Sequence, residues 1–137
     1  MSYLVDANVL SEGTRARPEA RVVAWLGRHD ALLHVSTLTL GEILKGVHLL
    51  PGGAKRRRLE SWFEEVVGSF AGKIVPFDED ACRTWGVFYA KHQRKGRPLG
   101  SFDSLIAATA LAHGHTLATR NTADFPGDVP VVNPWEQ

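Results

Sequence analysis

The fold is decided by the stretch Tyr3-Leu4-Val5-Asp6-Ala7-Asn8. Its first three residues are a short, β-prone run that is apolar on both faces, which is typical of a strand buried in a parallel sheet. The run ends in Asp6, and Asn8 follows two residues later. Ligands of open α/β sheets bind just beyond the carboxyl ends of the strands, so Asp6 is a candidate for metal or phosphate chemistry. The competing interpretation is that Asp6 caps the next helix, a position that Asp favours.

Working outward from this stretch, short strands alternate with helices along the whole chain. Further strands are expected at 34–36, 74–75, 115–119 and 130–132. Helices are expected at 8–12, from Pro18, from Thr37 to the Pro51-Gly52-Gly53 stop, around 59–70, from Asp78 and from Ser101 to Gly114. This alternation predicts an α/β fold in which helices cover both faces of a parallel sheet.

Two of these helices have informative apolar patterns. The helix around 59–70 has one apolar stripe, formed by Leu59, Trp62, Phe63, Val66, Val67 and Phe70. The helix that Ser101 is expected to cap is Ala-rich and apolar almost all round. Such a helix should be buried and should approach its neighbours closely.

The composition bounds the class of protein. A length of 137 residues predicts a single domain over 1–137, and 44% hydrophobic with 23% charged residues is ordinary for a globular protein. No apolar run has transmembrane length and the start lacks the pattern of a signal peptide, so we expect a cytoplasmic protein. The single cysteine, Cys82, excludes an intrachain disulfide and a multi-cysteine zinc site. Its helical position predicts a small buried hydrophobe.

The charges are balanced in number but uneven in position. Sixteen Lys and Arg face 15 Asp and Glu, which is not the excess of a general nucleic-acid coat protein. Basic clusters lie at 55–58 and 91–97. The first is either a solvated helix start or a patch that binds phosphate or an acidic partner, since cations at a helix start oppose the helix dipole. Basic patches around an acidic centre suit an enzyme that holds a polyanion and cuts it with a metal.

Four acids follow strands or begin helices in this arrangement: Asp6, Glu42, Asp103 and Asp124. Parallel strands have their carboxyl ends on one edge of the sheet, so all four can meet there. Crowded carboxylates repel one another and need cations or protons. Their hard oxygen atoms select Mg²⁺ or Mn²⁺.

Each acid also has a purely structural interpretation. Glu42 completes a capping box with Thr39. Asp103 lies at a helix start, where the macrodipole favours an acid, and Asp124 fits a turn before Phe125-Pro126. Other catalytic motifs are missing from the sequence: H-E-x-x-H, G-x-S-x-G, the P-loop and G-x-G-x-x-G.

Five segments together resemble the PIN-domain ribonucleases, specifically VapC-type toxins of bacterial toxin–antitoxin pairs near the FitB-like branch. They span the whole chain in the family's order and are 4–11, 36–43, 102–110, 119–125 and Asn133-Pro134-Trp135. The resemblance implies a three-layer α/β/α fold with a central, mostly parallel sheet of four to five short strands. It also implies Mg²⁺- or Mn²⁺-dependent endonuclease cleavage of RNA, inhibition by a cognate antitoxin, and a homodimer.

By match of motif, Asp6, Glu42 and Asp103 form the acidic centre that the resemblance implies. The family often has an acid directly after the Thr-Arg pair, where this chain has Asn121, and Asp124 is the candidate replacement. In the mechanism that we expect, Asp6 and Asp103 hold the metal and Glu42 assists directly or through water. Water attacks the phosphorus in line and leaves 5′-phosphate and 3′-hydroxyl ends.

Three further residues are expected to bind substrate, namely Asn8, Asn121 and Arg120. The two amides would orient water or phosphate as neutral hydrogen-bonding groups. Two other functions are left open at this point. One is a haloacid-dehalogenase-type phosphatase, which needs a second Asp where this chain has Asn8. The other is a catalytically weak PIN-like module that acts through protein partners.

Overall fold

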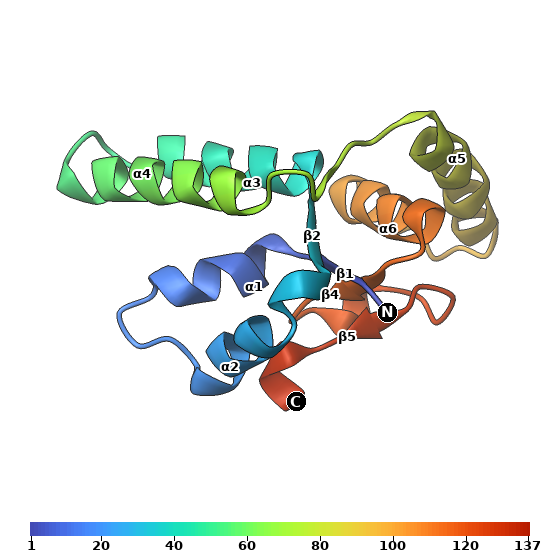
Figure 1. Cartoon of the computed structure of the whole chain (residues 1–137). Coiled ribbons are helices and arrows are strands. Elements are labelled where there is room, and N and C mark those ends of the chain that lie inside the picture. The colour runs from blue at the N-terminus through green and yellow to red at the C-terminus, as the bar shows by residue number, and fades with distance from the viewer.

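The computed structural model describes all 137 residues and contains one five-stranded sheet between helices (Figure 1). The strand order is β3-β2-β1-β4-β5, and every neighbouring pair is parallel. The strands are β1 (Tyr3–Val5), β2 (Leu33–Ser36), β3 (Ile74–Val75), β4 (Thr116–Ala118) and β5 (Val131–Val132). The expected α/β fold is confirmed, although the strand expected at 115–119 is shorter by one residue at each end.

The central strand is β1, formed by the stretch that opens the sequence. Leu4 pairs with His34 of β2 on one side and with Leu117 of β4 on the other. Alternate residues of a strand point to opposite faces, so Tyr3 and Val5 join one core cluster and Leu4 joins the second. Because all strands are parallel, the end of β1 brings Asp6 to the same edge as the carboxyl ends of its neighbours.

Six helices build the outer layers. They are α1 (Ala7–Ser11), α2 (Ala20–Arg28), α3 (Thr37–His48), α4 (Ala54–Ser69), α5 (Glu79–Arg94) and α6 (Ser101–His113). One core cluster joins β1 to α2, α3 and α4 through Trp25, Ile43 and Phe63. The other joins the sheet to α5 and α6 through Phe88 and Ala107. In Figure 1, α5 and α6 pack together on one side, and the α3–α4 hairpin extends away from the sheet.

Both apolar patterns in the sequence are confirmed. In α4, the stripe residues are either buried or packed against the core. In α6, Ala107, Ala108 and Ala110 have no exposed surface, and the helix ends at Gly114, whose φ of 72° is left-handed. Gly adopts this conformation without the steric cost that a Cβ would bring, and it is therefore the usual residue after a helix.

Three local expectations are wrong. Gly100, not Ser101, precedes the first turn of α6, and Ser101 is its first helical residue. The helix expected from Pro18 begins at Ala20. Cys82 is exposed, because Ala81 and Phe88 set the buried face of α5 and the next residue lies about 100° further round the helix. None of the helices has the length and apolar character that a membrane crossing requires.

Candidate functional site

Asp6 combines the two roles that the sequence left open. It is the N-cap of α1, and its Oδ1 accepts a hydrogen bond of 2.8 Å from the Ala7 amide. Its Oδ2 accepts a second bond, also of 2.8 Å, from the hydroxyl of Thr119 at the end of β4. The carboxylate is therefore fixed in orientation at the edge where β1 and β4 end, and it remains half-buried.

Glu42 lies in the second turn of α3, where a capping box does not form. The N-cap of α3 is Ser36, whose hydroxyl accepts a 3.0 Å bond from the Leu38 amide. The capping interpretation of Glu42 is therefore wrong, and its carboxylate has no hydrogen-bond or ion-pair partner. Burial raises the pKa of Glu42, the charges of Asp6 and Asp103 raise it further, and Lys45 partly offsets them.

Asp103 lies in the first turn of α6 and is half-buried. Burial raises the pKa of Asp103, and the negative charges of Asp6 and then Asp124 add to the effect. Asp124 is exposed at the end of a short 3₁₀ helix, Thr122–Asp124. Its amide bonds to the Asn121 carbonyl at 3.0 Å, so the turn interpretation of its backbone is correct, while its carboxylate still acts on Asp103.

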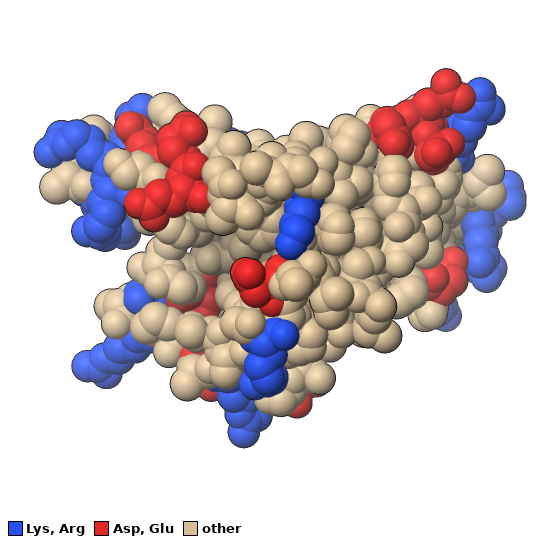
Figure 2. Space-filling model, viewed as in Figure 1, with Lys and Arg blue, Asp and Glu red and all other residues tan.

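These electrostatic couplings join the four acids into one group. Asp6 raises the pKa of both Glu42 and Asp103, and Asp124 reaches the group through Asp103. The acids come from the end of β1, from α3, from α6 and from the loop after β4. Figure 2 shows acidic side chains in the recess beneath the α3–α4 hairpin. The structure thus brings together the acids that the sequence singled out, and their roles as ligands stay a prediction.

The donor set suits a hard divalent cation. The four acids supply carboxylate oxygens, and burial, followed by the negative charges of neighbouring acids, raises the pKa of Glu42 and of Asp103. However, no three acids, histidines or cysteines are already closed into a complete metal-binding set. The chemistry of the donors, hard carboxylate oxygens from four segments, is therefore what fits a divalent cation here.

Thr119 is a site residue that the sequence analysis missed. It is fully buried, donates to Asp6, and accepts a bond of 3.2 Å from the Asn121 amide. Asn8 donates to it from its side-chain nitrogen at 3.5 Å, and the side-chain oxygen Oδ1 of Asn8 accepts a 3.3 Å bond from the backbone amide of Arg120. The sequence pattern presents Thr119 only as a β-branched strand residue. Its place after the strand beside β1 is the signal that could have found it.

Arg120 and Asn121 lie at the rim of this network. Both are exposed. The Arg120 guanidinium lies over the Trp135 ring, 4.9 Å from its centroid. This contact explains why the closing Asn133-Pro134-Trp135 segment belongs to the site's surroundings.

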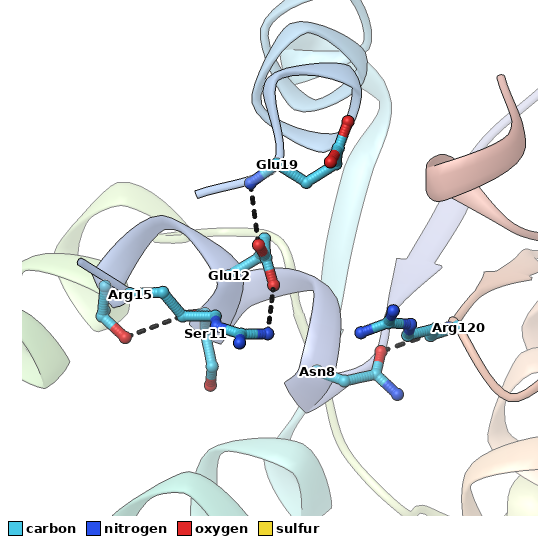
Figure 3. A network of polar contacts seen from close by, with 7 residues as sticks. Asn8, Ser11, Glu12, Arg15, Glu19 and Arg120 are labelled. Carbon is cyan, nitrogen blue, oxygen red and sulfur yellow. Dashed lines mark hydrogen bonds and ion pairs between the residues drawn. The ribbon is translucent and has the colours of Figure 1, made fainter. Parts of the chain in front are cut away.

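A second residue missed from the sequence is Glu12, which is 4% exposed (Figure 3). Its carboxylate accepts a 2.8 Å bond from the Glu19 amide and a 3.4 Å contact from Arg15. These contacts compensate the free-energy cost of removing the charged Glu12 carboxylate from water. Glu12 therefore closes the connection between α1 and α2 and holds Arg15. Figure 3 shows Asn8 and Arg120 next to this network.

Comparisons with known proteins agree with this architecture. The sequence model of the PIN domain matches residues 3–126. The chain is 37% identical to VapC ribonuclease Y4jK of Sinorhizobium fredii, over 97% of both chains. It is 40% identical to toxin FitB of Neisseria gonorrhoeae, over 96% of this chain and 97% of that protein. The crystal structure of FitAcB from Neisseria gonorrhoeae superposes with a TM-score of 0.89 and 39% identity, over 98% of this chain and 99% of that chain.

Proposed function

Because the chain belongs to the PIN domain family, we propose that its clustered acids Asp6, Glu42 and Asp103 cut RNA with the help of a divalent cation. The chain is a ribonuclease toxin of the VapC type, as the resemblance in its sequence implied. This membership removes the support for a phosphatase of the haloacid-dehalogenase type. The observation that supports the proposed centre is that burial, and then the negative charge of Asp6, raises the pKa of both Glu42 and Asp103, which come from two different helices.

Asp6 and Asp103 are the residues that would hold the cation, Mg²⁺ or Mn²⁺. When bound, such an ion stabilises negative charge on phosphate oxygens and acidifies water. Thr119 and the Ala7 amide hold the Asp6 carboxylate in one orientation by two hydrogen bonds. Glu42 has no partner of its own, so its oxygen atoms are free to complete the site directly or through water.

The neighbouring neutral groups orient the reactants. Asn8 bonds both Thr119 and the Arg120 amide, which fixes its side chain beside Asp6. Asn121 can donate and accept hydrogen bonds but brings no charge, so it cannot replace an acid. Asp124, whose charge acts on Asp103, supplies the fourth carboxylate, and exposed Arg120 binds a substrate phosphate.

The partners in this proposal are RNA, a cognate antitoxin and a second copy of the chain. The structural relatives include a toxin–antitoxin complex from Klebsiella pneumoniae, which supports an antitoxin as partner, and in this proposal the antitoxin blocks the site. Water attack leaves the 2′-hydroxyl unused, so the products carry 5′-phosphate and 3′-hydroxyl ends. Since cellular RNA is the target, the reaction takes place in the cytoplasm.

The test is cleavage of RNA by the purified protein with Mg²⁺, with Mn²⁺ and with EDTA. We expect cutting only with a metal, and products that ligate through a 5′-phosphate. Equal cutting in EDTA, or cyclic phosphate ends, would contradict the mechanism. RNA binding without cutting would support the PIN-like binding module instead. Release of phosphate from small esters serves as the control for phosphatase activity.

A further inference from the structure

Two hollows flank the acids, and we propose that they hold the RNA strand in different ways. The first, between α1 and the α3–α4 hairpin, receives a nucleobase and is called the hairpin cleft. The second, beside Asp124 at the end of α5, binds only the sugar-phosphate backbone and is called the loop groove. This inference rests on the proposed ribonuclease function, because it names how the substrate of the same site is held.

The hairpin cleft has the size and lining of a base-binding site. Its volume is about 700 Å³, and half of its lining residues are hydrophobic. That volume lies within the range of small-ligand pockets. Glu42 lines it, so the cleft opens directly onto the acids. Trp62 and Leu59 of α4 contribute apolar wall, and aromatic rings stack on nucleobases in single-stranded RNA.

The basic cluster at 55–58 divides into two faces at the mouth of this cleft. Lys55 and Arg58 are three residues apart, so they share one face of α4, and both line the cleft without a carboxylate partner. Arg56 instead pairs with Glu60 at 2.9 Å and contacts His48 at 2.6 Å. Arg57 lines a separate hollow with Glu60 and Glu64. Only half of the cluster is therefore available to a polyanion in the cleft.

The charge arrangement favours RNA as the occupant. Figure 2 shows basic side chains at the tip of the hairpin and acidic side chains deeper in the recess. An RNA strand would place backbone phosphates against Lys55 and Arg58, and its scissile phosphate against the acids. The apolar wall between them then faces a base.

The loop groove offers charge but little apolar surface. Its volume is about 570 Å³, only a quarter of its lining residues are hydrophobic, and Asp124 is one of the residues that line it. Lys91 and His92 also line it, but Asp128 holds them at 3.0 and 3.2 Å. Lys95 and Arg97 have no such partner. Phosphate contacts position a strand, whereas base contacts carry sequence information. The loop groove should therefore increase the affinity for RNA without favouring any particular base.

A cleft-filling substitution separates the two roles. Gly46 lies in α3, lines the cleft, and has open space where a Cβ would be. Gly46→Leu should fill the cleft without disturbing the core. Gly68→Leu is the matched control, because Gly68 is also exposed, helical and unobstructed, but lines none of these hollows. Trp62→Phe and Trp62→Leu add a second pair, since only Phe keeps a ring for stacking.

The first readout is binding of short labelled RNAs in EDTA, with each of the four bases in turn at every position. Wild type should favour one base at one position by about tenfold. Gly46→Leu and Trp62→Leu should lose this preference, whereas Gly68→Leu and Trp62→Phe should keep it. Lys95→Ala combined with Arg97→Ala should weaken the binding of all RNAs equally and reduce the salt slope by about 0.7 for each phosphate that the protein no longer neutralises.

The second readout, cleavage with Mg²⁺, keeps failure of this inference apart from failure of the proposed function. If wild type binds with base preference but does not cut, the proposed function fails and the inference stands. If wild type cuts but shows no base preference, the inference fails. It also fails if Gly46→Leu binds and cuts as wild type does, because RNA then does not enter the hairpin cleft, or if the loop-groove variant changes base preference. Thermal unfolding checks that each variant is folded.

Discussion

Two groups of acids in this molecule have opposite surroundings. At the carboxyl edge of the sheet, burial and like charges raise the pKa of Glu42 and Asp103. At the two ends of α5, Asp78 and Asp128 have lowered pKa values. The Ala81 amide and His113 stabilise the first carboxylate, and hydrogen bonds from Lys91 and His92 outweigh burial at the second. Paired acids hold helices in place, whereas crowded, unpaired acids destabilise the fold locally and are available for chemistry.

The largest effect is expected from Asp6→Asn. The Asn side chain keeps the shape of Asp and can still accept the hydrogen bond from the Ala7 amide. It lacks the negative charge with which Asp6 would bind a cation together with the other acids. We expect RNA cleavage to fall by at least about 10³-fold, which corresponds to about 4 kcal/mol of activation free energy. Circular dichroism should show an unchanged fold. Wild-type cleavage by this variant at saturating Mg²⁺ would remove Asp6 from the centre.

The next effect should appear in stability rather than in activity. Asp128→Ala leaves the buried His92 ring without its 3.2 Å partner and also frees Lys91. We expect the free energy of unfolding to fall by about 1 kcal/mol, because the exposed part of the carboxylate is screened by solvent.

The pH dependence of this loss follows from the lowered pKa of Asp128. The stabilisation is present above the unfolded-state pKa of about 3.9 and disappears as the pH falls through the lower folded-state pKa. Wild type and variant should therefore converge in stability under strongly acidic conditions. Urea unfolding at several pH values measures this, and a constant difference down to low pH would show that the ion pair is not its source.

The acidic edge of the sheet could be predicted from the sequence, because it follows from local patterns. The start Tyr3–Val5 with Asp6 predicted a buried strand and an acid at its end, because apolar pattern and strand polarity are local properties. The same reasoning placed all four acids on one edge. It did not find Thr119 or Glu12, whose roles depend on contacts 113 residues and 7 residues away, respectively.

Charge clusters were the least predictable feature. The four basic residues at 55–58 are adjacent in sequence, yet helix geometry sends Lys55 and Arg58 to one side and Arg57 to another. Capping was also ambiguous, since Thr39-x-x-Glu42 fits the sequence pattern of a box while Ser36 is the real cap. Which residue caps the helix depends on where the preceding strand ends. The end of a strand is set by its pairing with strands that lie far away in the sequence.

A loss of activity smaller than that of Asp6→Asn should separate Asp124 from the three central acids. Its carboxylate is exposed and acts on Asp103 alone, so Asp124→Ala should lower Mn²⁺ affinity and cleavage by about tenfold, equal to about 1.4 kcal/mol. Asn121→Asp should instead tighten Mn²⁺ binding without RNA, because it adds charge at the same rim. Calorimetric titration of Mn²⁺ compares both variants with wild type. Wild-type affinity and rate in Asp124→Ala would leave Asp124 as a turn residue only.

The smallest effect tests the crowding itself. A carboxyl whose pKa is raised on folding binds more protons in the folded state, so its charged form destabilises the protein above that pKa. Asp103→Asn in EDTA should therefore raise the free energy of unfolding slightly at neutral pH, because solvent screens much of the repulsion at this partly exposed carboxylate. This gain in stability should shrink as the pH falls through the raised folded-state pKa of Asp103. It should vanish well below the unfolded-state pKa of about 3.9, because the Asp103 carboxyl of wild type is then protonated in both the folded and the unfolded state. Mg²⁺ should stabilise wild type more than the variant. If Asp103→Asn is less stable than wild type at neutral pH, the acids at this edge are held by compensating contacts, and the contrast with Asp128 disappears.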